Sequence, residues 1–317
     1  MKKTLLTSIA SLLVATTFAQ RTVYVDIDAT GVENGTSWAT AYNEPQDAFA
    51  NANIGDNIWI AEGTYILQTT LRNYSFGWNK DSVSVYGGFD GTETALSQRD
   101  VENNPTIFSG EIQRDNDLTN NSYTVLTGPY GNSSTNKINY SLIDGITIRD
   151  GYSITNTSNN STRWGAGFYL QTNVRRLHIT NCVFTNNTAQ GAAAIYASAS
   201  GDSTYLEISN TKFIGNKSSF ASCVWSQANS GYQMNMRMYN CLFTDNINKN
   251  YGGVQVASVF YFGSNGTSAN TLISMANNTI TNNIDSLNSG STGTIIRLYK
   301  THNSQSNAVV EMGNCIL

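Results

Sequence analysis

A segment of eleven residues recurs along the second half of this 317-residue chain, and this repetition restricts the fold more than any other feature. The copies share an asparagine at positions 181, 210, 240, 277 and 314, so successive copies are 29, 30, 37 and 37 residues apart. Self-similarity at such periods is typical of solenoids and other repeat architectures. The copies occupy residues 177–187, 206–216, 236–246, 273–283 and 310–317, and a looser copy occupies 142–150.

Each copy begins with alternating apolar and polar residues, which indicates a strand with one buried face. It turns at the shared asparagine and in most cases is followed by a second short strand. Three copies close with a Phe-x-x-Asn element, and the copy at 273–283 has Ile280 in place of the Phe. Steps of 29 and 30 residues are too short for a propeller blade, which needs roughly forty. We therefore predict an all-β fold, a right-handed parallel β-helix (solenoid) with coils about 4.8 Å apart. The second strands are predicted at 165–170, 191–196, 220–225 and 251–256.

The N-terminus has the pattern of a secretory signal peptide. Residues 1–19 combine a short basic start, an apolar stretch and small residues before Gln20. No later segment has the uninterrupted apolar length of about eighteen residues that a membrane span needs. We therefore expect an extracellular or outer-cell-surface location without a membrane span.

The mature chain divides into a cap and a repeat region. Residues 20–110 are predicted to form an N-terminal strand and helix cap followed by irregular coils, with Asn43 as the N-cap of a helix that begins near Pro45. Residues 111–317 are predicted to form the β-helix repeats. The last copy stops at Leu317 before its closing asparagine, so we expect the repeats to be truncated at the C-terminus.

The recurring asparagines are predicted to be structural. An asparagine side chain tolerates left-handed turns and can hydrogen-bond to the coils above and below it. The closing positions are expected to form one asparagine ladder beside a stack of core side chains. The ladder consists of Asn187, Asn216, Asn246 and Asn283, and the stack consists of Phe184, Phe213, Phe243 and Ile280.

Several motifs resemble those of a known group of proteins. The N-terminal part contains Gly35-Thr-Ser-Trp38, Ala61-Glu-Gly-Thr-Tyr65 and Tyr86-Gly-Gly-Phe-Asp-Gly91, and it resembles exported right-handed β-helix proteins of Bacteroidota-type bacteria. The later copies resemble the polymorphic outer-membrane-protein repeat, which pairs Gly-Gly-Ala-Ile with Phe-x-x-Asn. This resemblance implies a secreted or cell-surface protein, often an adhesin. The group is functionally heterogeneous, so the resemblance does not supply an active site.

The charge balance argues against nucleic acid as a partner. Without Lys2 and Lys3, the chain has 16 Lys and Arg residues against 22 Asp and Glu residues, whereas nucleic-acid binding needs a clustered basic face.

The four cysteines are predicted to be free thiols, because Cys182 and Cys241 are two coils apart, about 9.6 Å by strand spacing. No metal-ligand spacing is present, so no metal or other cofactor is predicted; a Ca²⁺ site has only scattered aspartates to support it.

Two groups of outward-facing residues are candidate sites. His178, Glu207 and Arg237 occupy equivalent positions on successive coils, either as an acid–base trio or as a ladder of alternating charges. Tyr169, Tyr196 and Trp225 form a row on another strand. These aromatics are expected either to be exposed for ligand binding or to be an aromatic ladder covered by a loop.

The sequence favours a non-catalytic function. We expect a monomeric adhesin or glycan-binding scaffold whose partner is a polysaccharide or a host or cell-surface glycoprotein. A polysaccharide lyase or glycoside hydrolase is the alternative, because such enzymes share this fold. A spacer that holds a distal module is a third interpretation.

Overall fold

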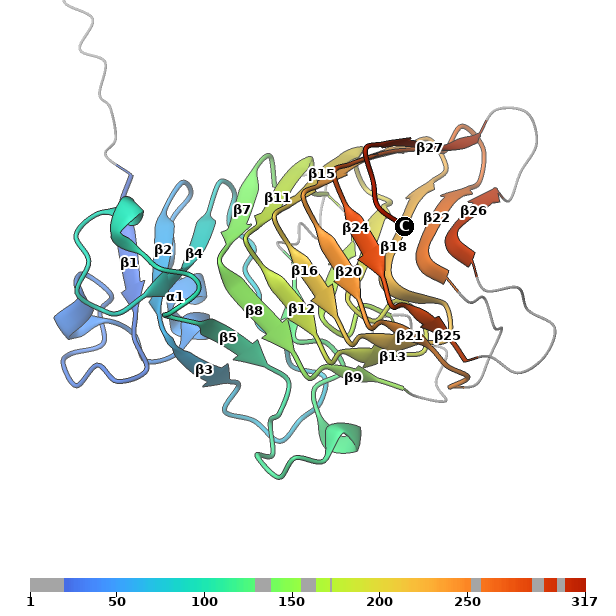
Figure 1. Ribbon diagram of the computed structural model, residues 1–317. Coiled ribbons are helices and arrows are strands. Elements are labelled where there is room, and N and C mark those ends of the chain that lie inside the picture. Colours follow the sequence, from blue (N-terminus) through green and yellow to red (C-terminus); the bar gives the residue numbers. More distant parts are fainter. Residues whose placement is uncertain are drawn as a thin grey trace, which may run out of the picture.

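The computed structural model describes residues 20–128, 138–154, 164–171, 173–251, 258–286, 294–300 and 306–317. In this part of the chain the strands pair in parallel, each with the equivalent strand of the next coil, as Figure 1 shows. The chain is a right-handed parallel β-helix, which confirms the predicted fold. The predicted signal peptide and most of the predicted strand at 251–256 lie outside the described residues.

Four parallel sheets form the walls of the helix. The longest has nine strands: β1 (Thr22–Val25), β2 (Asn57–Ala61), β4 (Ser84–Phe89), β7 (Ser141–Asp144), β11 (Arg176–Thr180), β15 (Thr204–Ser209), β19 (Gln233–Tyr239), β23 (Asn270–Ala276) and β27 (Asn307–Gly313). A seven-stranded sheet follows it around the coil: β3 (Gly63–Ile66), β5 (Thr106–Ser109), β8 (Ile146–Arg149), β12 (Val183–Thr185), β16 (Lys212–Ile214), β20 (Leu242–Thr244) and β24 (Thr279–Thr281).

The other two sheets complete each coil. The five-stranded sheet contains strands of only two residues: β9 (Tyr152–Ser153), β13 (Thr188–Ala189), β17 (Lys217–Ser218), β21 (Ile247–Asn248) and β25 (Ile284–Asp285). The six-stranded sheet contains β6 (Leu126–Thr127), β10 (Phe168–Gln171), β14 (Ile195–Ala199), β18 (Ala221–Asn229), β22 (Ser258–Asn265) and β26 (Thr294–Lys300).

A strand and a helix lie at the N-terminal end. β1 is the outermost strand of the nine-stranded sheet, and α1 (Pro45–Asn51) contacts it and buries Ala48 and Phe49 in the core. The prediction that Asn43 caps this helix is wrong, because Glu44 occupies the N-cap position. The Asn43 amide instead donates to the backbone oxygens of Asp26, Ile27 and Ala29. Three single-turn 3-10 helices are also present, at Trp38–Thr40, Leu96–Gln98 and Leu118–Asn120.

Stacked apolar side chains fill the interior. The rings of Phe184 and Phe213 are 5.2 Å apart and nearly parallel, and Phe213 stacks on Phe243 at 4.7 Å. Ile280 continues this column and is buried, as predicted from the repeat. Such a column buries each ring against its equivalents in the coils above and below, so it favours one register of stacking.

The predicted asparagine ladder is present. The Asn187 backbone N–H and side-chain amide both donate to Oδ1 of Asn216, at 3.2 and 3.1 Å. Asn216 donates in the same way to Asn246, and Asn246 to Asn283. Each of these amides also donates to a carbonyl oxygen of the preceding coil, so buried polar groups are paired through the wall.

The turns use left-handed backbone geometry at two places in each coil. The shared asparagines have φ between 48° and 55°, as their place after the first strand predicts. The residue before each ladder asparagine is also left-handed: Asn186, Gly215, Asp245 and Asn282.

All four cysteines are free, as predicted. The Cys182 thiol donates to the carbonyl oxygen of Thr180 at 3.1 Å, and the Cys241 thiol donates to that of Tyr239 at 3.3 Å. Burial raises the pKa of both thiols to about 12, so they remain protonated and act as small core residues.

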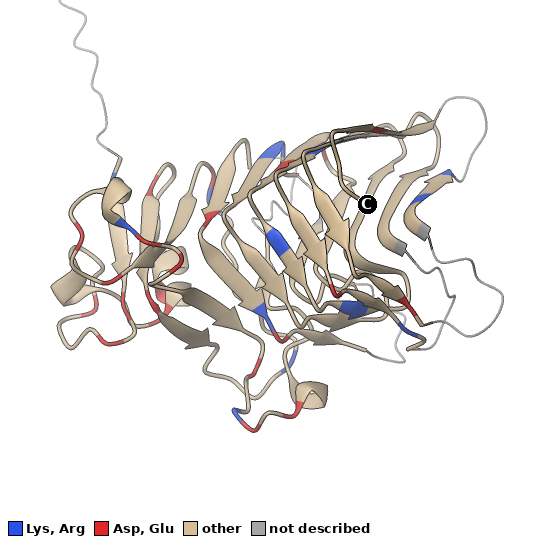
Figure 2. Cartoon of the chain, viewed as in Figure 1, with Lys and Arg blue, Asp and Glu red and all other residues tan. Residues whose placement is uncertain are grey.

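Charge is distributed unevenly along the helix. Residues 20–120 contain 15 Asp and Glu residues and five Lys and Arg residues, whereas residues 121–317 contain seven and eleven. Figure 2 shows that most of the acidic positions, in red, lie along the N-terminal coils. The later coils are therefore the part of the surface that repels an anion least.

The ladder gives a stability prediction. Asn216→Ala should lower the free energy of unfolding by about 2–4 kcal/mol, because Asn216 is fully buried and the change removes bonds to Asn187, Asn246 and the Phe184 carbonyl. Urea unfolding measures the loss. The exposed Asn307→Ala is the matched control and should cost less than about 0.5 kcal/mol. Equal losses of unfolding free energy in the two variants would mean that the ladder stabilises the fold no more than an exposed asparagine does.

Candidate functional site

The nine-stranded sheet brings His178, Glu207 and Arg237 together. They are direct neighbours on β11, β15 and β19, and all point away from the core. His178 Nε2 lies 3.6 Å from Oε1 of Glu207 and 2.9 Å from the Ser209 hydroxyl. The alignment predicted from the repeats is therefore correct, and the contacts decide what the group can do.

Two tyrosines hold the Glu207 carboxylate. The Tyr205 hydroxyl donates to Oε2 at 2.9 Å, and the Tyr239 hydroxyl donates to Oε1 at 2.8 Å. Partial desolvation opposes ionisation of Glu207, but these two bonds and the nearby His178 and Arg237 outweigh it and keep its pKa below the ordinary value. An ionised carboxylate with both oxygens engaged is a poor general base. The contacts therefore favour the charge-ladder interpretation of the trio over the catalytic one.

Sequence reasoning missed Tyr205 and Tyr239. Both lie on outward positions, Tyr205 two residues before Glu207 and Tyr239 two residues after Arg237. The alternation that placed the trio also places these tyrosines on the same face. That their hydroxyls reach one carboxylate depends on rotamers, which the pattern does not specify.

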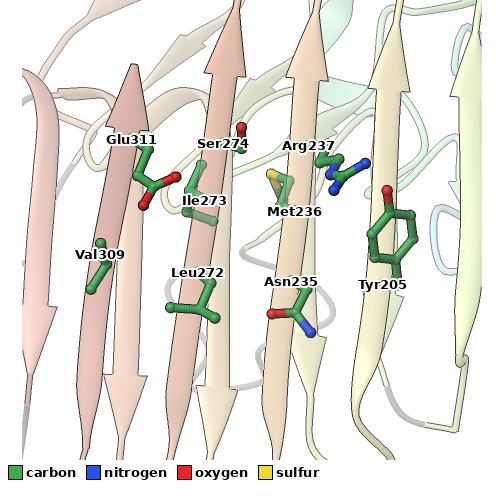
Figure 3. Close-up of a pocket in the computed structure, with 9 residues that line it drawn as sticks. All are labelled: Tyr205, Asn235, Met236, Arg237, Leu272, Ile273, Ser274, Val309 and Glu311. Atoms are coloured by element: carbon green, nitrogen blue, oxygen red, sulfur yellow. The ribbon is translucent and has the colours of Figure 1, made fainter. Parts of the chain in front are cut away.

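An open groove of about 290 Å³ lies beside the trio, on the outer face of β15, β19, β23 and β27. Figure 3 shows two rows of side chains across the strands. One row contains Val309, Leu272, Asn235 and Tyr205, and the other contains Glu311, Ser274 and Arg237. The sheet thus offers apolar, amide, hydroxyl and charged groups along one direction.

The Tyr205 ring closes one end of the groove. The guanidinium groups of Arg237 and Arg176 lie 5.8 and 5.2 Å from its centroid, within cation–π range. The ring is therefore held by two cations and by the bond to Glu207. A side chain fixed in this way loses little conformational entropy when a ligand packs beside it.

The predicted aromatic binding row is not exposed, so that prediction is wrong. Tyr169, Tyr196 and Trp225 do point away from the core, on adjacent strands of the six-stranded sheet. However, they are only 9, 2 and 7% exposed and form a second buried cluster. Trp164 packs on Tyr196 at 5.0 Å and on Trp225 at 4.7 Å, and Phe220 stacks on Trp225. The covered ladder, the other interpretation of the row, is what the structure contains.

The acidic, histidine and cysteine side chains of the described residues are dispersed. These residues contain no group of three or more His, Cys, Asp or Glu side chains that could hold a metal ion. The scattered aspartates have other partners, since Asp144 pairs with Arg99 and Asp150 with Arg149. We therefore assign no Ca²⁺ ligands. Within the same residues, no helix has the length and apolar character needed to cross a membrane.

The chain was compared with known families, curated sequences and solved structures. No known protein family matches the chain, and no curated protein sequence matches it. Among solved structures, the chain is similar to pectin methylesterase PemA from Erwinia chrysanthemi, with 11% sequence identity and a TM-score of 0.40. The similarity covers 84% of this chain and 81% of that chain. The assignment of the fold depends on the strand pairing described above.

The Glu207 contacts give a pH prediction. A carboxylate with a lowered pKa stabilises the folded state above its ordinary value of 4.5, and this contribution is lost as the pH falls through the lower pKa of the folded protein. Glu207→Gln should therefore cost more stability near pH 7 than near pH 3, as measured by urea unfolding. Tyr239→Phe should raise the pKa of Glu207 in a carboxyl NMR titration. Equal costs at both pH values would refute this role.

The cover over the aromatic row gives a second prediction. A Cβ atom at Gly191 would lie 1.9 Å from Cδ1 of Trp164, so Gly191→Ala should displace the indole. We expect a loss of about 1–3 kcal/mol of stability and red-shifted tryptophan fluorescence. Gly313→Ala is the control, because a Cβ there meets nothing within 4 Å. Unchanged fluorescence in Gly191→Ala would contradict the packing of Trp164.

Proposed function

We propose that this chain is a secreted or cell-surface β-helix protein that binds polysaccharide in the groove on the nine-stranded sheet, as a non-catalytic adhesin or glycan-binding scaffold. The groove composition is the observation that supports this. Sugar rings have apolar faces and hydroxyl edges, and the groove sets Leu272 and Val309 beside the polar Asn235 and Ser274.

The direction of the groove also suits a chain-like ligand. Its residues follow one another across the strands, so contacts repeat about every 4.8 Å along the helix axis. A flexible polymer can make several weak contacts in this way, and their combined affinity exceeds that of each one.

The spacing of the carboxylates supports a binding role over glycoside hydrolysis. Glu207 and Glu311 occupy one column but are three strands apart, about 14 Å at the backbone. Glycoside hydrolases hold their two carboxyl groups roughly 5–9.5 Å apart. Glu207 is also engaged by two tyrosines, as described above.

Binding to a polysaccharide panel tests the proposal. The double variant Leu272→Ala, Val309→Ala removes exposed apolar surface from the groove and should weaken binding about fivefold, measured by affinity electrophoresis or calorimetry. Leu242→Ala, on the outer face of the seven-stranded sheet, is the matched control and should bind normally. Release of reducing or unsaturated sugar ends would instead establish a hydrolase or a lyase. Unchanged binding by the double variant would place the site elsewhere.

A further inference from the structure

The groove contains two opposite charges, Arg237 and Glu311, at its two ends. Among the described residues, neither Arg237 nor Glu311 has an ion-pair partner. Glu207 is the neighbour of Arg237 in the sheet and the two charges attract one another, but they form no ion-pair contact, and both Glu207 oxygens accept hydrogen bonds from tyrosines. Arg237 is thus left facing the groove beside the Tyr205 ring.

Arg237 and Glu311 do not pair with one another. Ser274 lies between them in the same column, so their backbones are two strand spacings apart, about 9.6 Å. Figure 3 shows the Arg237 guanidinium turned toward Tyr205 and away from Glu311. The groove therefore has a cation near one end and a carboxylate near the other.

The space between the charges is suited to an uncharged, partly apolar segment. Leu272 and Val309 are 46 and 43% exposed on its surface, and the Asn235 amide and Ser274 hydroxyl supply hydrogen-bonding groups. Among the described strands, β15, β19 and β23 pair on both sides, and only β27 lies at the edge of the sheet, so a ligand that runs across all four strands cannot add to them as a strand. A ligand here is recognised by side chains, which favours a saccharide over a peptide.

We infer, on the basis of the proposed glycan binding, that the ligand is a zwitterionic saccharide segment, in which a carboxylate and a free amine lie within two or three sugar units. The carboxylate pairs with Arg237, the amine pairs with Glu311, and the intervening ring packs on Leu272 and Val309. The excess of basic over acidic residues in the later coils favours approach of the carboxylate end.

Hyaluronan and its partially de-N-acetylated form make a matched pair of probes. They differ only in that some acetamido groups of the first are free amines in the second. The de-N-acetylated polymer should bind about threefold more tightly at low salt, and the difference should shrink as salt is added. Glu311→Gln should abolish the preference for the amine, whereas Arg237→Met should weaken binding of both polymers. Lys212→Met on β16 and Glu102→Gln in the N-terminal part are charge-matched controls on other surfaces and should behave as wild type.

The outcomes separate this inference from the proposed function. If the two polymers bind equally well, the inference of a zwitterionic ligand is wrong. It is also wrong if the preference for the amine persists in Glu311→Gln. Groove-dependent binding of a neutral glucan, unaffected by Arg237→Met, also overturns it but leaves glycan binding intact. Equally tight competition by an extended peptide that carries one Glu and one Lys overturns the saccharide class. If no polysaccharide in the panel binds, both proposals fail.

Discussion

Each coil of this protein is held to the next by hydrogen bonds between equivalent residues, and every other property depends on that vertical alignment. The asparagine ladder illustrates the constraint, because Asn216 and Asn246 each bond to a neighbouring coil in both directions. The amides are fully buried, so a shift of one residue would leave several polar groups unpaired at a cost of about 1–3 kcal/mol each. The stacked Phe184, Phe213 and Phe243 rings impose the same register from the apolar side.

The repeat predicts this architecture because the constraint is periodic. The shared asparagines and the Phe-x-x-Asn elements identify the first two strands of each coil, the turn between them and the free thiols. The two-residue strands such as Thr188–Ala189 are too short to carry an alternation and were not predicted. The wrong prediction of an N-cap at Asn43 has a similar cause. Its side-chain amide donates to the backbone oxygens of Asp26 and Ala29, which local sequence does not reveal.

The candidate site was predictable only as far as the strand register reaches. Register places His178, Glu207 and Arg237 in one column, and it places Tyr196 and Trp225 outside the core. It does not reveal what covers an outward residue, because the covering side chain, such as Trp164, comes from outside the strands. It also does not reveal that two tyrosine hydroxyls donate to Glu207, or that Arg237 lies against the Tyr205 ring. The groove arises from these side-chain choices and from small differences between the coils.

The asparagine ladder also has a direction. Every amide–amide bond in it runs from the earlier coil to the later one, so each coil presents an acceptor to the coil before it and donors to the coil after it. At the ladder position, each coil therefore offers the same donors and the same acceptor to its neighbours. Gene duplication or loss of a single unit would rejoin the same donors to the same acceptors, so the length of the molecule can evolve without redesign of its interior.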